Sequence, residues 1–145
     1  MSATRWDGPR VAHGGALKKH CTTENGMDER VQRPVFEYRL HRFDVPCVDT
    51  TTGPGPNGVL SKREDESTVK AILKCVDVSV NKHDTFGTAV VGHYDCAGNP
   101  GDEARQNADT RHVVRFSRAS YSDRNVIGLH VNDQWVVEEI EVAGF

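Results

Sequence analysis

Apolar positions along the chain recur with two different periods, which together predict alternating helices and strands. Apolar residues three or four positions apart lie on one helical face: Val69, Ile72, Leu73, Val76 and Val80. Ser61–Glu64 has the spacing of a capping box, so we predict a helix from this segment to about His83. Ala89–Val91, by contrast, is an unbroken apolar run before Gly92 and His93, which predicts a buried strand that ends at His93.

Weaker patterns predict the remaining elements. These are a helix after Pro34 with Phe36, Leu40 and Phe43 on one face, a strand at 45–49, a helix from near Asp102 with Ala104, Ala108 and Val113 on one face, a strand at 125–131, a turn at 132–133 and a strand within 135–142. Residues 20–28 are too polar to favour a strand, and the glycine- and proline-rich residues 53–58 predict a loop.

This alternation of strands and helices predicts the fold class. It is typical of an α/β protein of three layers, in which helices cover both faces of a mainly parallel central sheet. Ligand sites in such sheets lie beyond the carboxyl ends of the strands. His93 and Cys96 follow a predicted strand directly and are therefore expected at such a site.

Length and composition limit the possible classes of function. The 145 residues suit one domain, which we place at 20–145, preceded by a tail or arm at 1–19 without clear periodicity. A net charge of −3 argues against nucleic-acid binding, and no apolar run approaches the roughly 20 residues that span a bilayer. Without an apolar signal segment near the start, we expect a cytoplasmic protein whose four cysteines are reduced thiols.

The chemistry of the predicted site begins with His93 and Cys96. Imidazole and thiolate are both ligands that zinc prefers, so the His-x-x-Cys spacing offers half of a zinc site. The plainer alternative is a buried cysteine beside a hydrogen-bonded histidine. Five other histidines lack mutual helical spacing and are interpreted as surface or core residues: His20, His41, His83, His112 and His130. Cys47 and Cys75 are interpreted as small core residues.

Two segments resemble the β-class carbonic anhydrases, which carry a Cys-x-Asp-x-Arg motif after one strand and a His-x-x-Cys motif after a later one. The segments are Gly26-Met27-Asp28-Glu29-Arg30 and His93-Tyr94-Asp95-Cys96. The resemblance covers residues 20–142 and is to small, compact members of this group. It implies zinc-dependent hydration of carbon dioxide to bicarbonate, or hydrolysis of a related small heterocumulene, in a homodimer or higher homo-oligomer.

The resemblance also assigns roles to particular residues. His93 and Cys96 would bind zinc, Asp28 would be a metal ligand or orient the reacting water, and Arg30 would hold Asp28 in place. Gly26 departs from the pattern, because it stands where the family has a zinc-binding cysteine and has no side chain. Asp28 or, after a local rearrangement, Cys21 would have to replace that ligand.

The departure at Gly26 leaves other interpretations open. The chain could be a metal-free relative without catalytic activity that serves in binding or assembly. Asp28 and Arg30 could form an ordinary ion pair at the start of a helix, since an aspartate there is stabilising in itself. Cys96 beside His93 could also act as a thiol of lowered pKa.

Overall fold

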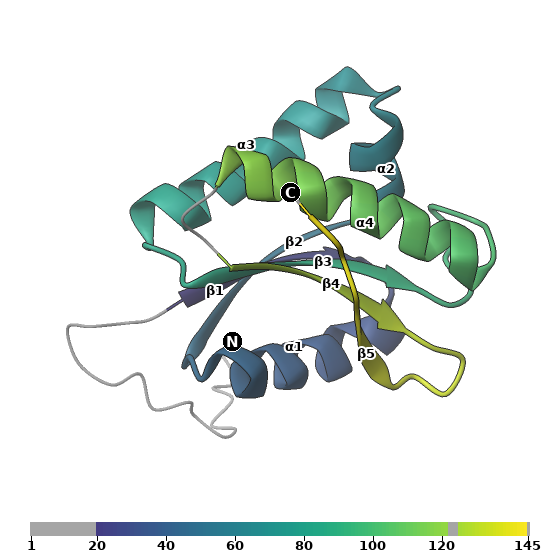
Figure 1. The fold of residues 1–145 in the computed structure, drawn as a ribbon, viewed down its shortest axis with the longest axis horizontal. Helices are drawn as coiled ribbons and strands as arrows, with labels where there is room; N and C mark the ends of the chain where they lie inside the picture. Colours follow the sequence, from purple (N-terminus) through teal and green to yellow (C-terminus); the bar gives the residue numbers. More distant parts are fainter. Residues whose placement is uncertain (1–19, 122–124, 145) are drawn as a thin grey trace, which may run out of the picture.

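The computed structural model describes residues 20–121 and 125–144, which form one sheet with helices on both faces (Figure 1). The elements follow one another as β1 (His20–Gly26), α1 (Glu29–Phe43), β2 (Cys47–Gly53), α2 (Pro56–Lys62), α3 (Glu66–Lys82), β3 (Gly87–His93), α4 (Glu103–Ser120), β4 (Asn125–Val131) and β5 (Val137–Ile140). The tail predicted at 1–19 lies outside the described residues. Within the described chain, no helix is both long and apolar enough to cross a membrane.

The sheet has the strand order β2-β1-β3-β4-β5, and β5 alone runs antiparallel to its neighbour. The chain moves outward from β1 to β2 and then back past β1 to β3, so two successive crossovers run in opposite directions. Because crossovers are right-handed, they place α1 on one face and α2 to α4 on the other, as Figure 1 shows. The predicted three-layer α/β fold is thereby confirmed.

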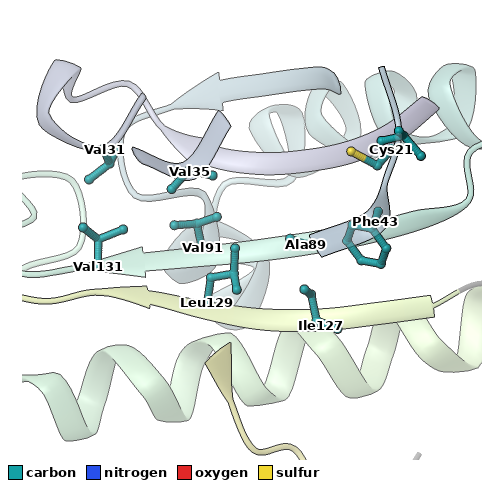
Figure 2. Close-up of a cluster of buried hydrophobic side chains, with 10 residues drawn as sticks. Cys21, Val31, Val35, Phe43, Ala89, Val91, Ile127, Leu129 and Val131 are labelled. Atoms are coloured by element: carbon teal, nitrogen blue, oxygen red, sulfur yellow. The ribbon is translucent and has the colours of Figure 1, made fainter. Parts of the chain in front are cut away.

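Two apolar clusters join the layers. On the α1 face, Val31, Val35 and Phe43 of the helix form one cluster with residues of β3 and β4, with Phe43 near Ala89 and Ile127 (Figure 2). On the opposite face, apolar residues of α2, α3 and α4 pack on Val90 of β3 and Val126 of β4. The helix residues of this cluster are Leu60, Val69, Ile72, Val76, Val80, Val113 and Val114. Burial on both faces explains why β3 is a continuous apolar run rather than an alternating one.

Strand β1 is the largest departure from the sequence prediction. Residues 20–26 form a strand between β2 and β3 despite their polar composition, and residues 21–26 are fully buried. Tertiary contacts compensate for this polarity in part: the Thr22 hydroxyl lies 2.6 Å from Ser79 Oγ and 2.8 Å from Thr85 Oγ1, whereas Thr23 Oγ1, Glu24 Oε2 and Asn25 Oδ1 have no hydrogen-bond partner among the described residues. Packing against neighbours, rather than intrinsic propensity, decides the strand here.

The helices α1 and α3 begin elsewhere than predicted. Helix α1 starts after Asp28, before Pro34, and buries Val31 and Val35 while Phe36 stays 41% exposed. The predicted capping box is wrong: α3 is capped by Asp65, whose carboxylate accepts a hydrogen bond from the Thr68 N–H at 3.1 Å. The predicted apolar face of α3 and its end at His83 agree with the structure.

Helix α4 buries polar rather than apolar residues near its start. It begins after Asp102 as predicted, but Ala104 and Ala108 are exposed, while Gln106 and Thr110 are buried. Gln106 Oε1 and Thr110 Oγ1 both accept from Asn57 Nδ2, at 2.9 and 3.2 Å. Asn57 belongs to α2, whose presence also corrects the loop predicted at 53–58. Strand β2 likewise occupies 47–53 rather than 45–49.

Candidate functional site at the carboxyl ends of β1 and β3

The candidate site lies where the chain reverses its direction across the sheet. Strands β1 and β3 are neighbours, yet their following connections leave toward opposite faces, which creates a crevice beyond their carboxyl ends. Gly26 ends β1 and His93 ends β3, so the crevice brings both family motifs together. A Cβ atom on Gly26 would lie 3.0 Å from His93 Nε2. The residue at position 26 therefore directly faces the imidazole.

The His93 ring is buried and held in one orientation. Its side chain is 3% exposed, and Nδ1 lies 2.7 Å from the Tyr94 carbonyl oxygen. Because a carbonyl oxygen only accepts, Nδ1 carries the hydrogen, and in the neutral ring Nε2 holds the lone pair. The nitrogen that faces position 26 is thus the one able to bind a metal.

Cys96 completes the intact half of the site. Asp95 takes a left-handed conformation with φ 53°, and the turn brings Cys96 close enough to His93 for each to shift the pKa of the other. Burial raises the pKa of the Cys96 thiol, but the His93 hydrogen bond and charge and the N–H groups of Asn99 and Gly98 outweigh it, so the pKa lies below its usual value. Burial lowers the pKa of His93, but its hydrogen bonds to Cys96 and Tyr94 outweigh that effect and raise it.

Asp28 and Arg30 form a clamp at the start of α1. The Asp28 carboxylate caps the helix by accepting from the Arg30 N–H at 3.0 Å. It also receives the Arg30 guanidinium on both oxygens, with Nε 3.0 Å from Oδ1 and Nη2 2.6 Å from Oδ2. The Arg30 side-chain hydrogen bond is the main reason that the pKa of Asp28 falls to about 2. Asp28 is therefore an ionised carboxylate already occupied by an arginine.

Arg30 is itself fixed by contacts to two further residues, Asp95 and Trp135. Its Nη1 lies 3.3 Å from Asp95 Oδ2, in the turn between His93 and Cys96. Its guanidinium lies 4.2 Å from the ring centroid of Trp135, a cation–π arrangement. Arg30 thus links α1, the His93–Cys96 turn and the loop before β5. The predicted pairing of Asp28 with Arg30 is present, and it serves the helix cap as well.

A cavity of about 500 Å³ opens beside His93 and Cys96. Sequence reasoning missed two of its residues, Gln106 of α4 and His130 of β4. His130 is 2% exposed, and its Nδ1 has no hydrogen-bond partner within the described chain. Its register opposite Gly92 places it beside the end of β3. No local sequence pattern predicts that Gln106 or His130 lines this cavity. The pairing of β3 with β4 and the packing of α4 bring them to it.

Two donor groups of the site meet the requirements of zinc. His93 Nε2 and the Cys96 thiol suit the metal, and the lowered pKa of Cys96 favours the thiolate that binds it. Asp28 would become a third ligand only after leaving Arg30 and moving toward the pair, because among the described residues its carboxylate does not lie within 4.8 Å of both the His93 and Cys96 donor atoms. Across residues 20–121 and 125–144, three potential ligand atoms lie within 4.8 Å of one another at a different place, formed by His20, Asp49 and His83.

Cys21, the other proposed substitute for the missing ligand, does not reach the site. It lies near the start of β1 and is fully buried in the apolar cluster beneath α1 (Figure 2). Burial is the main cause that raises its pKa. Five residues of extended strand, about 16 Å, separate it from Gly26. Cys47 is half-buried and Cys75 is exposed, so the prediction that Cys75 is a core residue is wrong.

The fold and the site together define a protein of the β-carbonic-anhydrase type. The sequence model of the family described as “Putative carbonic anhydrase” matches residues 16–141, and the chain belongs to that family. A solved β-carbonic anhydrase of the filamentous ascomycete Sordaria macrospora, described as tetrameric, superimposes with a TM-score of 0.54 at 11% identity, covering 90% of this chain and 84% of that one. No curated protein matches the sequence.

Proposed function

We propose that the chain is a carbonic anhydrase-like enzyme that hydrates carbon dioxide, or hydrolyses a related small heterocumulene, at a weakened zinc centre. The observation that carries this proposal is the pairing of His93 and Cys96, with Nε2 of His93 turned toward the family's missing ligand position. His93 and Cys96 would hold the metal, and Asp28 would be the third ligand after release from Arg30. Zinc would supply Lewis acidity that lowers the pKa of water toward neutrality.

The residues around the metal position would orient the ligands and bind the substrate. The Tyr94 carbonyl keeps His93 in the tautomer that a metal needs. Arg30 would control how much of the time the Asp28 carboxylate is available, because it now binds both carboxylate oxygens. The cavity lined by Gln106 and His130 is ample for a three-atom substrate. His130 would form part of the polar wall of that cavity.

The test combines zinc content with the rate of carbon dioxide hydration in stopped flow. Cys96→Ser is expected to remove about one equivalent of zinc per chain and the activity. Cys75→Ser is the matched control, since Cys75 is an exposed cysteine of α3 away from the site, and it should retain both. A wild-type chain that shows neither carbon dioxide hydration nor hydrolysis of a related small heterocumulene after reconstitution with zinc, or a Cys96→Ser variant that stays active, would overturn the proposal.

One observation favours a second candidate, a metal-free relative that binds small ligands or serves in assembly. Both oxygens of Asp28 are engaged by Arg30, so the present arrangement offers two zinc ligands rather than three. If this candidate is right, the wild-type protein contains no zinc at this site. It also binds bicarbonate when a chelator is present. Calorimetry with bicarbonate before and after chelation separates it from the enzyme.

We further propose that the chain assembles as a homodimer or a higher homo-oligomer. The support is the similarity in fold to the Sordaria macrospora β-carbonic anhydrase, which is described as a tetramer. Light scattering of the purified chain measures the state directly, and a monomer at all accessible concentrations would contradict the proposal.

A further inference from the structure

A second cluster of potential metal ligands lies at the opposite end of the sheet. His20 begins β1, Asp49 is the third residue of β2, and His83 caps the C-terminus of α3. One donor atom from each lies within 4.8 Å of the others. Six strand steps of about 3.3 Å separate His20 from Gly26, so this cluster is about 20 Å from the candidate active site. In Figure 1 it lies at the left end of the sheet, where β1 begins and α3 ends.

Asp49 is the centre of the cluster. Its Oδ2 accepts from Ser79 Oγ at 2.6 Å and lies 2.6 Å from His83 Nδ1. The rings of His83 and His20 stack with their centroids 4.4 Å apart. Two imidazoles and a carboxylate therefore converge from three different elements. This is a ligand set that first-row transition metals commonly take.

Buried hydroxyl groups hold the carboxylate in position. Ser79 bonds Asp49 on one side and lies 2.6 Å from Thr22 Oγ1 on the other, and Thr22 in turn contacts Thr85 at 2.8 Å. Such partners orient a ligand in the way that outer hydrogen bonds do in known metal sites. The ligands themselves remain accessible from solvent, because the side chains of His83 and Asp49 are 46% and 30% exposed.

We propose that His20, Asp49 and His83 form a binding site for a divalent first-row transition-metal ion, separate from the His93–Cys96 site. Tetrahedral ligands at about 2.05 Å from a metal lie about 3.4 Å apart, so His83 Nδ1 and Asp49 Oδ2 would separate by about 0.8 Å as the ion replaces the proton between them. Cys47 stands opposite His20 in the strand register, next to the site. The ion would tie the end of α3 to the two strands.

The test uses Zn²⁺ as the probe, in calorimetric titrations of the full chain. A variant with His93→Gln and Cys96→Ser silences the first site and should still bind about one Zn²⁺. Adding His20→Gln and His83→Gln should abolish this binding. Adding His41→Gln and His112→Gln instead removes two exposed histidines of α1 and α4 and should leave it intact. Ser79→Ala is expected to weaken binding about tenfold, because it removes the hydrogen bond that orients Asp49.

Two results would overturn the proposal. One is a silenced variant that binds no Zn²⁺ although its circular dichroism shows the native fold. The other is unchanged stoichiometry after His20 and His83 are replaced. If silencing the first site impairs folding, the two histidine substitutions are made in the wild-type chain, where they should lower the stoichiometry by about one and remove the matching part of the zinc-induced rise in melting temperature. Either failure leaves the carbon dioxide hydration proposal untouched.

Discussion

The two ends of the sheet differ in how their donor groups are arranged. At the carboxyl end, the family motifs place His93 and Cys96 together, but Gly26 supplies no ligand and Asp28 is bound by Arg30. At the amino end, three donors converge although no motif connects them. A recognisable motif therefore does not guarantee a complete ligand set, and potential ligands can converge without a motif.

The contrast has a physical origin in the neighbours of each carboxylate. Asp28 meets a guanidinium, which holds a carboxylate in two-point geometry and competes with any cation. Asp49 meets Ser79 and His83, a hydroxyl and an imidazole that keep an oxygen oriented while leaving room for a metal. The availability of a carboxylate, more than its presence, decides which end binds a metal more readily.

The largest expected effect comes from restoring the missing ligand with Gly26→Cys. A four-ligand zinc site is worth about 10–16 kcal/mol, or about 3 kcal/mol per ligand, so zinc affinity at the carboxyl end should rise about 100-fold. The new Cβ would meet His93 Nε2 at 3.0 Å, a contact that needs a shift of a few tenths of an ångström. Competition with a chromophoric chelator measures the change, and carbon dioxide hydration should rise with it.

Two matched variants separate ligation from sterics. Gly26→Ser adds the same Cβ without a thiol and should give no comparable gain. Gly53→Cys adds a thiol at the position paired with Gly26 on β2, where nothing lies within 4 Å of the new Cβ, and should leave the site unchanged. An equal gain from all three substitutions would show that the gain does not come from a thiolate ligand at position 26. No gain from Gly26→Cys would show that the geometry no longer suits zinc.

Sequence reasoning recovered the parts of the structure that depend on local patterns. The apolar face of α3, the strand that ends at His93 and the paired Asp28 and Arg30 could all be predicted, because each lies within a short segment. The three-layer fold followed from the alternation of those segments. These are features for which neighbours in sequence are also neighbours in space.

The features that could not be predicted depend on distant parts of the chain. The composition of β1 is too polar to predict a strand, since the partners of Thr22, which are Ser79 and Thr85, lie 57 and 63 residues away along the chain. The sequence predicts His20 and His83 to be surface or core residues, because their spacing does not reveal that β1 and the end of α3 bring their rings together. His130 entered the cavity through strand pairing alone. Each miss reflects a contact that spacing along the sequence does not encode.

The second-largest expected effect concerns Glu24, which lies on β1 between the two ends of the sheet. Its titration makes the stability of the whole fold depend on pH, so it has to be known before the pH dependence of the two sites is compared. Burial raises the pKa of Glu24 to about 8 from 4.5, and its Oε2 lacks a hydrogen-bond partner among the described residues. Because the pKa of Glu24 is higher in the folded than in the unfolded chain, its contribution to the free energy of unfolding is full below about pH 4.5. That contribution falls as pH rises toward 8. At about 1.4 kcal/mol per pH unit, the loss between pH 5 and 7 is about 2–3 kcal/mol.

Glu24→Gln should remove that loss. Denaturant unfolding at pH 5 and at pH 7 gives the change in the free energy of unfolding for the wild type and for the variant. Subtracting one change from the other removes the contributions of the other titrating groups. Glu64→Gln, an exposed glutamate between α2 and α3, is the control and should reproduce the wild-type profile. A wild-type profile no steeper than that of Glu24→Gln would mean that Glu24 is not a protonated carboxyl near neutral pH.

The smallest expected effect, about tenfold, tests whether Arg30 is what makes the two carboxylates differ. Arg30→Gln should let the pKa of Asp28 rise from about 2 toward about 3.9, since the Arg30 hydrogen bond is the main cause of its depression. The released carboxylate should strengthen zinc binding at the carboxyl end about tenfold, and further substitution of Asp28→Asn should cancel that gain. Arg33→Gln on the same helix, where Arg33 pairs with Glu37, is the matched control. Carboxyl chemical shifts during an acid titration report the pKa, and chelator competition reports the affinity. A rise in pKa without tighter zinc binding would show that Asp28 caps α1 and is not a ligand, which would leave the amino end as the better metal site of the two.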